Sequence, residues 1–270
     1  MLILVFSLVG LGIAVPVGLK AGILAALGAF LGGFLLQALI MFLFLLYLCS
    51  RVDQNVPQEQ DDPLYRKVTD LILGSVLPIL RIHIQKTGMD LVPKEGRFLL
   101  VCNHCSDSDP VILMREFRKY KMAFISKREN STMFVIGPMM HKLQCQLINR
   151  ENDREALKTI LKCIQILKED KASVAVFPEG GILSEDGKLH HFKPGVFKIA
   201  QKAGVPIVVC TLKNTLPVVP NILHLRASHV ELDVLGVIDT DTVMALKTVE
   251  IAEKAHAMMA KNLGPELLAD

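Results

Sequence analysis

The chain has 270 residues, a net charge of only +3 and a hydrophobic fraction of 51%, above the roughly 45–50% usual for a soluble domain. It has no tryptophan, no basic stripe and no zinc-finger spacing, so nothing in it indicates a nucleic-acid partner. Its six cysteines are scattered without a paired spacing. We therefore expect reduced core residues and not a disulfide framework.

The first 50 residues carry a single charged side chain, Lys20. About 20 apolar residues suffice for a helix to cross the hydrocarbon of a bilayer, and the uncharged stretch 21–50 is long enough. A signal peptide fits poorly, because no positive region precedes the stretch 1–19 and apolar sequence resumes directly after Lys20. We predict that residues 1–50 form a membrane-associated helix or a helical hairpin.

The polar residues 51–63 include two prolines and are expected to form a linker. Arg51, Arg66 and Lys67 follow the apolar block, although acidic residues lie among them, and they favour a cytoplasmic face for what comes next. The remaining chain, residues 64–270, is expected to form one domain.

The rest of the sequence alternates between two kinds of apolar pattern. Short apolar runs predict strands at 81–85, 98–102, 121–126, 144–148, 173–177, 206–212 and 229–235. Helical spacing predicts helices at 64–80, 110–119, 153–168, 194–202 and 240–262, with Asp153 as a plausible N-cap. This alternation indicates an α/β fold with a mostly parallel sheet flanked by helices. Because ligands of such sheets bind beyond the carboxyl ends of the strands, the loops after Cys102 and Phe177 are the places to search.

The loop after Cys102 places His104 and Asp109 five positions apart. A carboxylate in such a loop can hold one imidazole nitrogen, which leaves the other nitrogen as a base for the proton of an alcohol. This is the His–Asp half of a serine-hydrolase triad, with the hydroxyl supplied by the substrate. From this motif alone, a polar loop whose Asn and Asp residues make turns remains an alternative.

The loop after the strand at 173–177 reads Phe-Pro-Glu-Gly-Gly, and its two glycines allow a ligand to approach the backbone. Arg150 closes an apolar run, where an arginine can hold a phosphate with two parallel hydrogen bonds. A plain turn and a solvated arginine are the alternatives at these two places.

Taken together, these blocks resemble the glycerol-phosphate acyltransferase family, most closely the 1-acylglycerol-3-phosphate acyltransferases of bacterial type. The matching blocks are Asn103-His104 with Asp109, the apolar stretch ending at Arg150, Phe-Pro-Glu-Gly at 177–180, Val-Pro-Ile at 205–207, and Lys127. The resemblance covers about residues 80–235, and its first and third blocks are the specific ones.

The resemblance implies that His104, oriented by Asp109, deprotonates the free hydroxyl of a lysophosphatidate-like acceptor. The alkoxide would attack the thioester of acyl-carrier protein or coenzyme A, giving phosphatidic acid without a covalent acyl-enzyme. Asn103, or backbone N–H groups near it, would stabilise the oxyanion. The family implies no metal and no cofactor beyond the acyl thioester, which is a co-substrate.

The same resemblance assigns the acceptor phosphate to Lys127 and Arg150, with Glu179 and Gly180 shaping the pocket and Lys193 assisting at a helix start. The chain departs from the family after Gly180, where Gly-Ile-Leu stands in place of Thr-Arg-Ser. A different acceptor, such as another lysolipid or glycerol 3-phosphate, therefore stays open.

Two further classes of function compete with this interpretation. His104, Asp107 and Asp109 could form part of a metal-dependent phosphoesterase, although such enzymes draw further ligands from other strands. The chain could also be a non-catalytic lipid-binding protein, against which the intact His104–Asp109 pair argues. A covalent route through Cys105 fits poorly, because adjacent side chains on an extended segment point apart.

Overall fold

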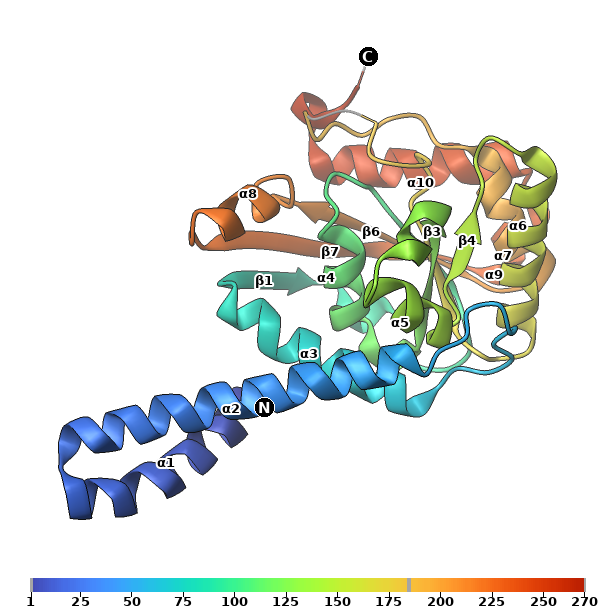
Figure 1. Cartoon of the computed structure of the whole chain (residues 1–270). Helices are drawn as coiled ribbons and strands as arrows, with labels where there is room; N and C mark the ends of the chain where they lie inside the picture. The colour runs from blue at the N-terminus through green and yellow to red at the C-terminus, as the bar shows by residue number, and fades with distance from the viewer. Residues whose placement is uncertain (1, 184–185, 270) are drawn as a thin grey trace.

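In the computed structural model, which describes residues 2–183 and 186–269, a helical hairpin projects from an α/β body (Figure 1). The hairpin consists of α1 (Leu2–Ala21) and α2 (Ile23–Ser50), which reverse direction at Gly22. Gly22 has φ +86°, a left-handed conformation that only glycine adopts without cost. The two helices pack through the edge-to-face rings of Phe6 and Phe34, 5.7 Å apart. Both helices are long and apolar enough to cross a membrane, by length and composition.

The predicted linker is held against the body by hydrogen bonds to α5 (Ile136–Lys142) and the residues after it. The Lys142 ammonium donates to the Gln58 side chain at 2.9 Å, and the Gln144 amide donates to the Gln58 carbonyl at 2.8 Å. The linker ends at Asp62, whose carboxylate caps α3 (Pro63–Ile79). The base of the hairpin is thus fixed relative to the body.

The body is built on one seven-stranded sheet of order β1-β7-β6-β2-β5-β3-β4. The strands are β1 (Ile82–Thr87), β2 (Leu99–Cys102), β3 (Met122–Lys127), β4 (Gln146–Ile148), β5 (Ser173–Val176), β6 (Ile207–Lys213) and β7 (Ser228–Ile238). The five strands from β6 to β4 are mutually parallel, whereas β7 runs antiparallel to β6 and carries β1 with it. The predicted mostly parallel sheet is confirmed.

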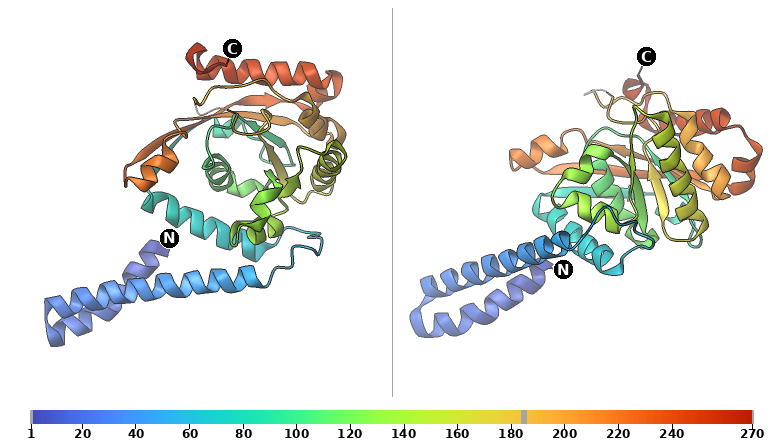
Figure 2. Two further views of the ribbon diagram at one scale, coloured as in Figure 1. Left: turned by 45° about the horizontal axis from the view of Figure 1, so that its top comes forward. Right: turned by 45° about the vertical axis from the view of Figure 1, so that its right-hand side comes forward.

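Helices cover both faces of this sheet (Figure 2). One face packs against α3, α4 (Asp109–Glu116), α5 and α8 (Val218–Leu223), and the other against α6 (Asp153–Lys168), α7 (Lys198–Ala203), α9 (Thr240–Ala245) and α10 (Thr248–Leu263). Short 3-10 turns join them: η1 (Met89–Leu91), η2 (Arg118–Tyr120), η3 (Arg128–Thr132), η4 (Pro194–Phe197) and η5 (Pro265–Leu267). Because side chains alternate along a strand, Leu100 and Leu99 of β2 enter opposite cores.

Three helix predictions need correction. The helix expected over 240–262 is two helices, because Leu246 is extended and Lys247 begins a new helix by donating its backbone N–H to Glu250. Asn152, and not Asp153, is the N-cap of α6. The short helices α5 and α8 were not predicted at all.

Candidate active site

The parallel strands bring the predicted site segments together at the carboxyl ends of the strands. His104 follows β2 and the Phe-Pro-Glu-Gly-Gly loop follows β5, the neighbour of β2. Lys127 ends β3 and Arg150 follows β4, the next two strands in the order. Parallel strands end at the same edge, so segments that are far apart in the sequence share one location.

His104 and Asp109 are in direct contact. The Nδ1 atom of His104 lies 3.0 Å from Oδ2 of Asp109, which also accepts the backbone N–H groups of Cys105 at 2.7 Å and Ser106 at 2.8 Å. Asp109 is fully buried, and its Oδ1 atom has no partner within the described residues. A carboxylate held in this way keeps the imidazole proton on Nδ1, so Nε2 is left as the basic nitrogen.

The face of the imidazole ring also packs against an aromatic side chain. Its ring stacks on Phe177 with centroids 4.0 Å apart and planes 17° apart. The His104 side chain is only 14% exposed. A ring held in one orientation can be kept within hydrogen-bond reach of the proton that a base takes.

Glu179 binds protein backbone on both of its carboxylate oxygens. Oε1 accepts the N–H of His104 at 2.8 Å, and Oε2 accepts the N–H of His190 at 3.0 Å. Burial raises the pKa of Glu179 to about 7, although both hydrogen bonds favour its charged form. Glu179 is 1% exposed, so through these two hydrogen bonds it holds the His104 loop against the segment around His190.

Asn103 is likewise a positioning residue. Its amide donates to the carbonyl of Leu212 at 2.9 Å and accepts the N–H of Leu212 at 2.8 Å, which ties the end of β2 to β6. Its remaining amide hydrogen is directed to Cys105 Sγ at 3.4 Å. The backbone N–H groups of His104, Cys105 and Ser106 also donate hydrogen bonds within the protein.

We call the Phe-Pro-Glu-Gly-Gly loop at 177–181 the second loop. Two cations lie directly over its glycines. A Cβ atom added to Gly180 would stand 2.8 Å from Lys193 Nζ, and one added to Gly181 would stand 2.6 Å from Arg150 Nη1. Both glycines have positive φ, at +88° and +154°. Glycine is therefore needed both for the turn and for the close approach of the two side chains.

Within the described residues, these cations have no acidic partner at ion-pair distance. Among the described residues, no ion pair or side-chain hydrogen bond is formed by Lys127, Arg150 or Lys193, whereas the neighbouring Arg128 pairs with Glu155 at 3.3 Å. Lys127 shares the sheet edge but is exposed, and it does not contact the other two. Positive charge without a protein partner at one edge suits an anionic ligand.

A segment that follows the second loop closes over the catalytic one. The Cys105 thiol donates to the Gly187 carbonyl at 3.4 Å, and Leu189 pairs with residues 267–269 through hydrogen bonds of 2.8 and 3.0 Å. Burial and the charge of Asp109 raise the pKa of Cys105 to about 12. Cys105 therefore stays a thiol near neutral pH and is unsuited to act as a nucleophile.

Within residues 2–183 and 186–269, no three His, Cys, Asp or Glu side chains are placed to share a metal ion. Asp107 is exposed and, within these residues, forms no hydrogen bond to His104 or Asp109.

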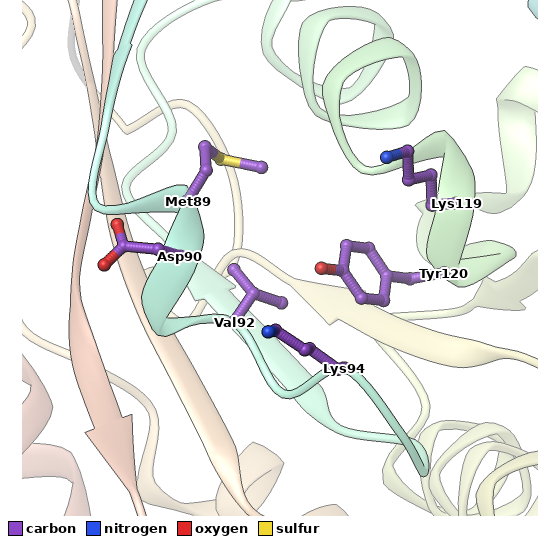
Figure 3. Close-up of a pocket in the computed structure, with 6 residues that line it drawn as sticks. All are labelled: Met89, Asp90, Val92, Lys94, Lys119 and Tyr120. Carbon is purple, nitrogen blue, oxygen red and sulfur yellow. The ribbon is translucent and has the colours of Figure 1, made fainter.

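A separate pocket lies at the opposite edge of the sheet (Figure 3). It is formed by η1, η2 and the segment before β2, and its lining residues are Met89, Asp90, Val92, Lys94, Lys119 and Tyr120. The strands β2 and β3 begin here, whereas the His104 site lies at their carboxyl ends. The pocket is therefore distinct from the His104 site.

Part of the chain matches a model of a known protein family. Residues 83–213 match the family model described as Acyltransferase, and this range contains the His104–Asp109 pair, the second loop and both cations. Over this range, the chain contains an acyltransferase domain of that family.

Within that family it is similar to proteins named 1-acyl-sn-glycerol-3-phosphate acyltransferase. It is 35% identical over 147 residues to the chloroplastic protein BAT2 of Brassica napus, covering 54% of this chain but only 41% of that protein. A protein of Mycoplasma pneumoniae with the same name, marked probable, is 28% identical over 72% of this chain and 75% of its own length. The crystal structure of the Thermotoga maritima enzyme PlsC shares the fold, with a TM-score of 0.61, 21% identity, and coverage of 82% of this chain and 87% of that one.

Proposed function

We propose that this protein transfers a fatty acyl group from acyl-carrier protein or coenzyme A to the free hydroxyl of 1-acylglycerol 3-phosphate, giving phosphatidic acid. The observation that carries the proposal is the buried Asp109 carboxylate, which fixes the imidazole of His104 at the carboxyl ends of the strands, where Arg150 and Lys193 form no ion pair with the described residues. The names of the similar proteins support the choice of substrate.

The proposed chemistry is a direct displacement. Nε2 of His104 takes the proton of the acceptor hydroxyl as its oxygen attacks the thioester carbonyl. The new ester C–O bond forms, the C–S bond breaks, and the thiolate leaves with the proton from the imidazolium. Asp109 stabilises the imidazolium while it exists. The reaction needs no cofactor besides the thioester.

Recognition of the acceptor is assigned to the cations above the second loop. Arg150 and Lys193 flank the backbone of Gly180 and Gly181, where a phosphate can bind both. The Thr-Arg-Ser sequence of the family is absent here, so these two side chains would supply the charge. Lys127, at the same edge, is the third candidate.

The hairpin would hold this reaction at a bilayer. Its two helices expose apolar side chains along most of their length, for example Leu8 at 60% and Leu35 at 67%. A lysolipid could then enter, and the two-tailed product leave, along the membrane. We place the body on the cytoplasmic face, as the charges after residue 50 suggest.

The test uses the full chain in lipid nanodiscs with labelled acyl-CoA or acyl-carrier protein, offered separately with lysophosphatidate. We expect phosphatidate from the wild type, loss of it in His104→Ala, and full activity in His83→Ala, which alters an exposed histidine on edge strand β1. Acylation of glycerol 3-phosphate or another lysolipid, with lysophosphatidate inert, would correct the acceptor. If folded protein transfers to no acceptor from either donor, the proposal fails and the phosphoesterase and lipid-binding alternatives return.

A further inference from the structure

An apolar projection of the body stands apart from the site. Leu223 and Leu225, at the end of α8, are 78% and 82% exposed, and Ile79 at the end of α3 is 58% exposed. The two elements meet where the Arg81 guanidinium donates to the Leu225 carbonyl at 3.1 Å. We call this surface the α3–α8 tip. Single exposed leucines are ordinary, but several together mark an interaction surface.

The tip has a defined conformation. Arg81 and Leu225 both have positive φ, at +56° and +55°, which is uncommon for residues with a side chain. Besides their mutual hydrogen bond, the Arg81 carbonyl accepts the N–H of Ser228 at 3.0 Å, just before β1 and β7 begin to pair. Strained residues persist where the surrounding structure holds them, and here they direct Leu225 into solvent.

The charge around the tip has one sign. The segments 71–89 and 214–230 contain no Asp or Glu, whereas Arg81 and Arg226 are both exposed. Exposed leucines with flanking arginines match a bilayer interface that contains anionic lipids, since the apolar groups enter the headgroup region and the cations remain at the phosphates.

The position of the tip also favours a bilayer as its partner. In the views of Figures 1 and 2, α8 and the end of α3 project to the side of the body from which the hairpin extends. A bilayer that receives the hairpin would therefore face the tip. We propose that the α3–α8 tip is a second membrane contact that binds an anionic bilayer surface. This proposal rests on the insertion of the hairpin in the proposed function.

The absence of tryptophan from the chain allows a direct test, because Leu225→Trp introduces a single indole fluorophore. The full chain is reconstituted in vesicles of phosphatidylcholine and phosphatidylglycerol, with and without brominated acyl chains. We expect blue-shifted emission that the brominated lipid quenches. Leu161→Trp, at a 56% exposed position on α6, is the matched control and should be neither shifted nor quenched.

A third variant separates this proposal from the membrane function itself. Leu35→Trp reports on the hairpin and should also be quenched. Quenching of Leu35→Trp without quenching of Leu225→Trp would overturn the tip contact alone. If neither is quenched, hairpin insertion fails as well. In the Leu225→Trp background, Arg226→Gln should abolish the extra quenching that phosphatidylglycerol confers, and unchanged quenching would overturn the role of charge.

Discussion

A single carboxylate oxygen of Asp109 accepts three hydrogen bonds, so the single oxygen of an amide could replace it. In Asp109→Asn the amide oxygen can keep all three contacts, so the loop and the His104 ring stay in place while the negative charge is lost. We expect kcat to fall by about 10²- to 10⁴-fold, the usual contribution of general base catalysis. Steady-state kinetics with saturating lysophosphatidate measures this. A fall smaller than about tenfold would contradict the role of the carboxylate.

Arg150 and Lys193, which form no ion pair with the described residues, should determine affinity for the acceptor. Charge-assisted hydrogen bonds contribute roughly 1.5–3 kcal/mol, so Arg150→Ala and Lys193→Ala should each raise KM for lysophosphatidate by about 10- to 100-fold. Arg128→Ala is the matched control, because Arg128 already pairs with Glu155. Neither substitution should raise KM for monoacylglycerol, which lacks the phosphate. An equal rise of KM for both acceptors would mean that the cations do not bind the phosphate.

The raised pKa of Glu179 makes folding stability depend on pH. The folded state binds this proton up to about pH 7, and the unfolded chain releases it near 4.5. Glu179 contributes its full share to the free energy of unfolding below the unfolded pKa. This share, about 3 kcal/mol, is lost as the pH rises to about 7. Thermal unfolding in detergent at pH 5 and pH 8 measures the loss. Glu179→Gln, which cannot titrate, should show a smaller difference between the two pH values, and an equal difference would refute the assignment.

At the residue scale, the sequence located the His104–Asp109 pair because both members lie in one short loop. It could not give the hydrogen-bond partners of Asn103 and Glu179, because these partners lie far along the chain: Leu212 is 109 residues from Asn103, and His104 is 75 from Glu179. Motif spacing carries no information on such contacts. The approach of Lys193 to Gly180 depends on the same unpredictable tertiary packing.

Among the elements, α6 offers a test of helix capping beside the site. The Asn152 side chain accepts the N–H groups of Arg154 and Glu155, and it sits two residues after Arg150. Asn152→Ala should lower the free energy of unfolding by about 1 kcal/mol. Asp153→Ala, one position on, should have a smaller effect because it removes only a charge near the helix dipole. Denaturant titration of both variants decides which residue is the cap.

The elements that the sequence missed are short ones. The helices α5 and α8 have seven and six residues, too few to establish a helical period. The break between α9 and α10 contains no proline or glycine. It depends on the Glu250 side chain, which accepts the Lys247 N–H at the start of α10. Long elements with strong periodicity, such as α6, were placed correctly to within a residue.

For the whole molecule, alternation of strands and helices was enough to predict a mostly parallel sheet. It could not give the strand order, nor the reversal that places β7 and β1 antiparallel to the rest. The 11-residue β7 reads like any apolar strand, and its direction follows from the connection through α8. Tertiary packing sets that connection.

The hairpin gives a prediction at this scale. The chain should stay with membranes after washing with high salt and with alkaline carbonate, because apolar insertion resists both treatments. A chain that lacks residues 2–44 keeps Leu48 and Cys49, whose side chains belong to the core, and carbonate should release it. Sedimentation followed by immunodetection measures both. Release of the full chain by carbonate would contradict insertion.

The pairing of Leu189 with residues 267–269 creates a mechanical path into the catalytic loop. His190, the residue after Leu189, donates to Glu179, which in turn holds the backbone of His104. A pull on residues 267–269 therefore reaches the general base through a short relay of hydrogen bonds. A bulky protein fused close behind this segment would strain that relay, so a reporter or purification handle is better joined through a long flexible spacer.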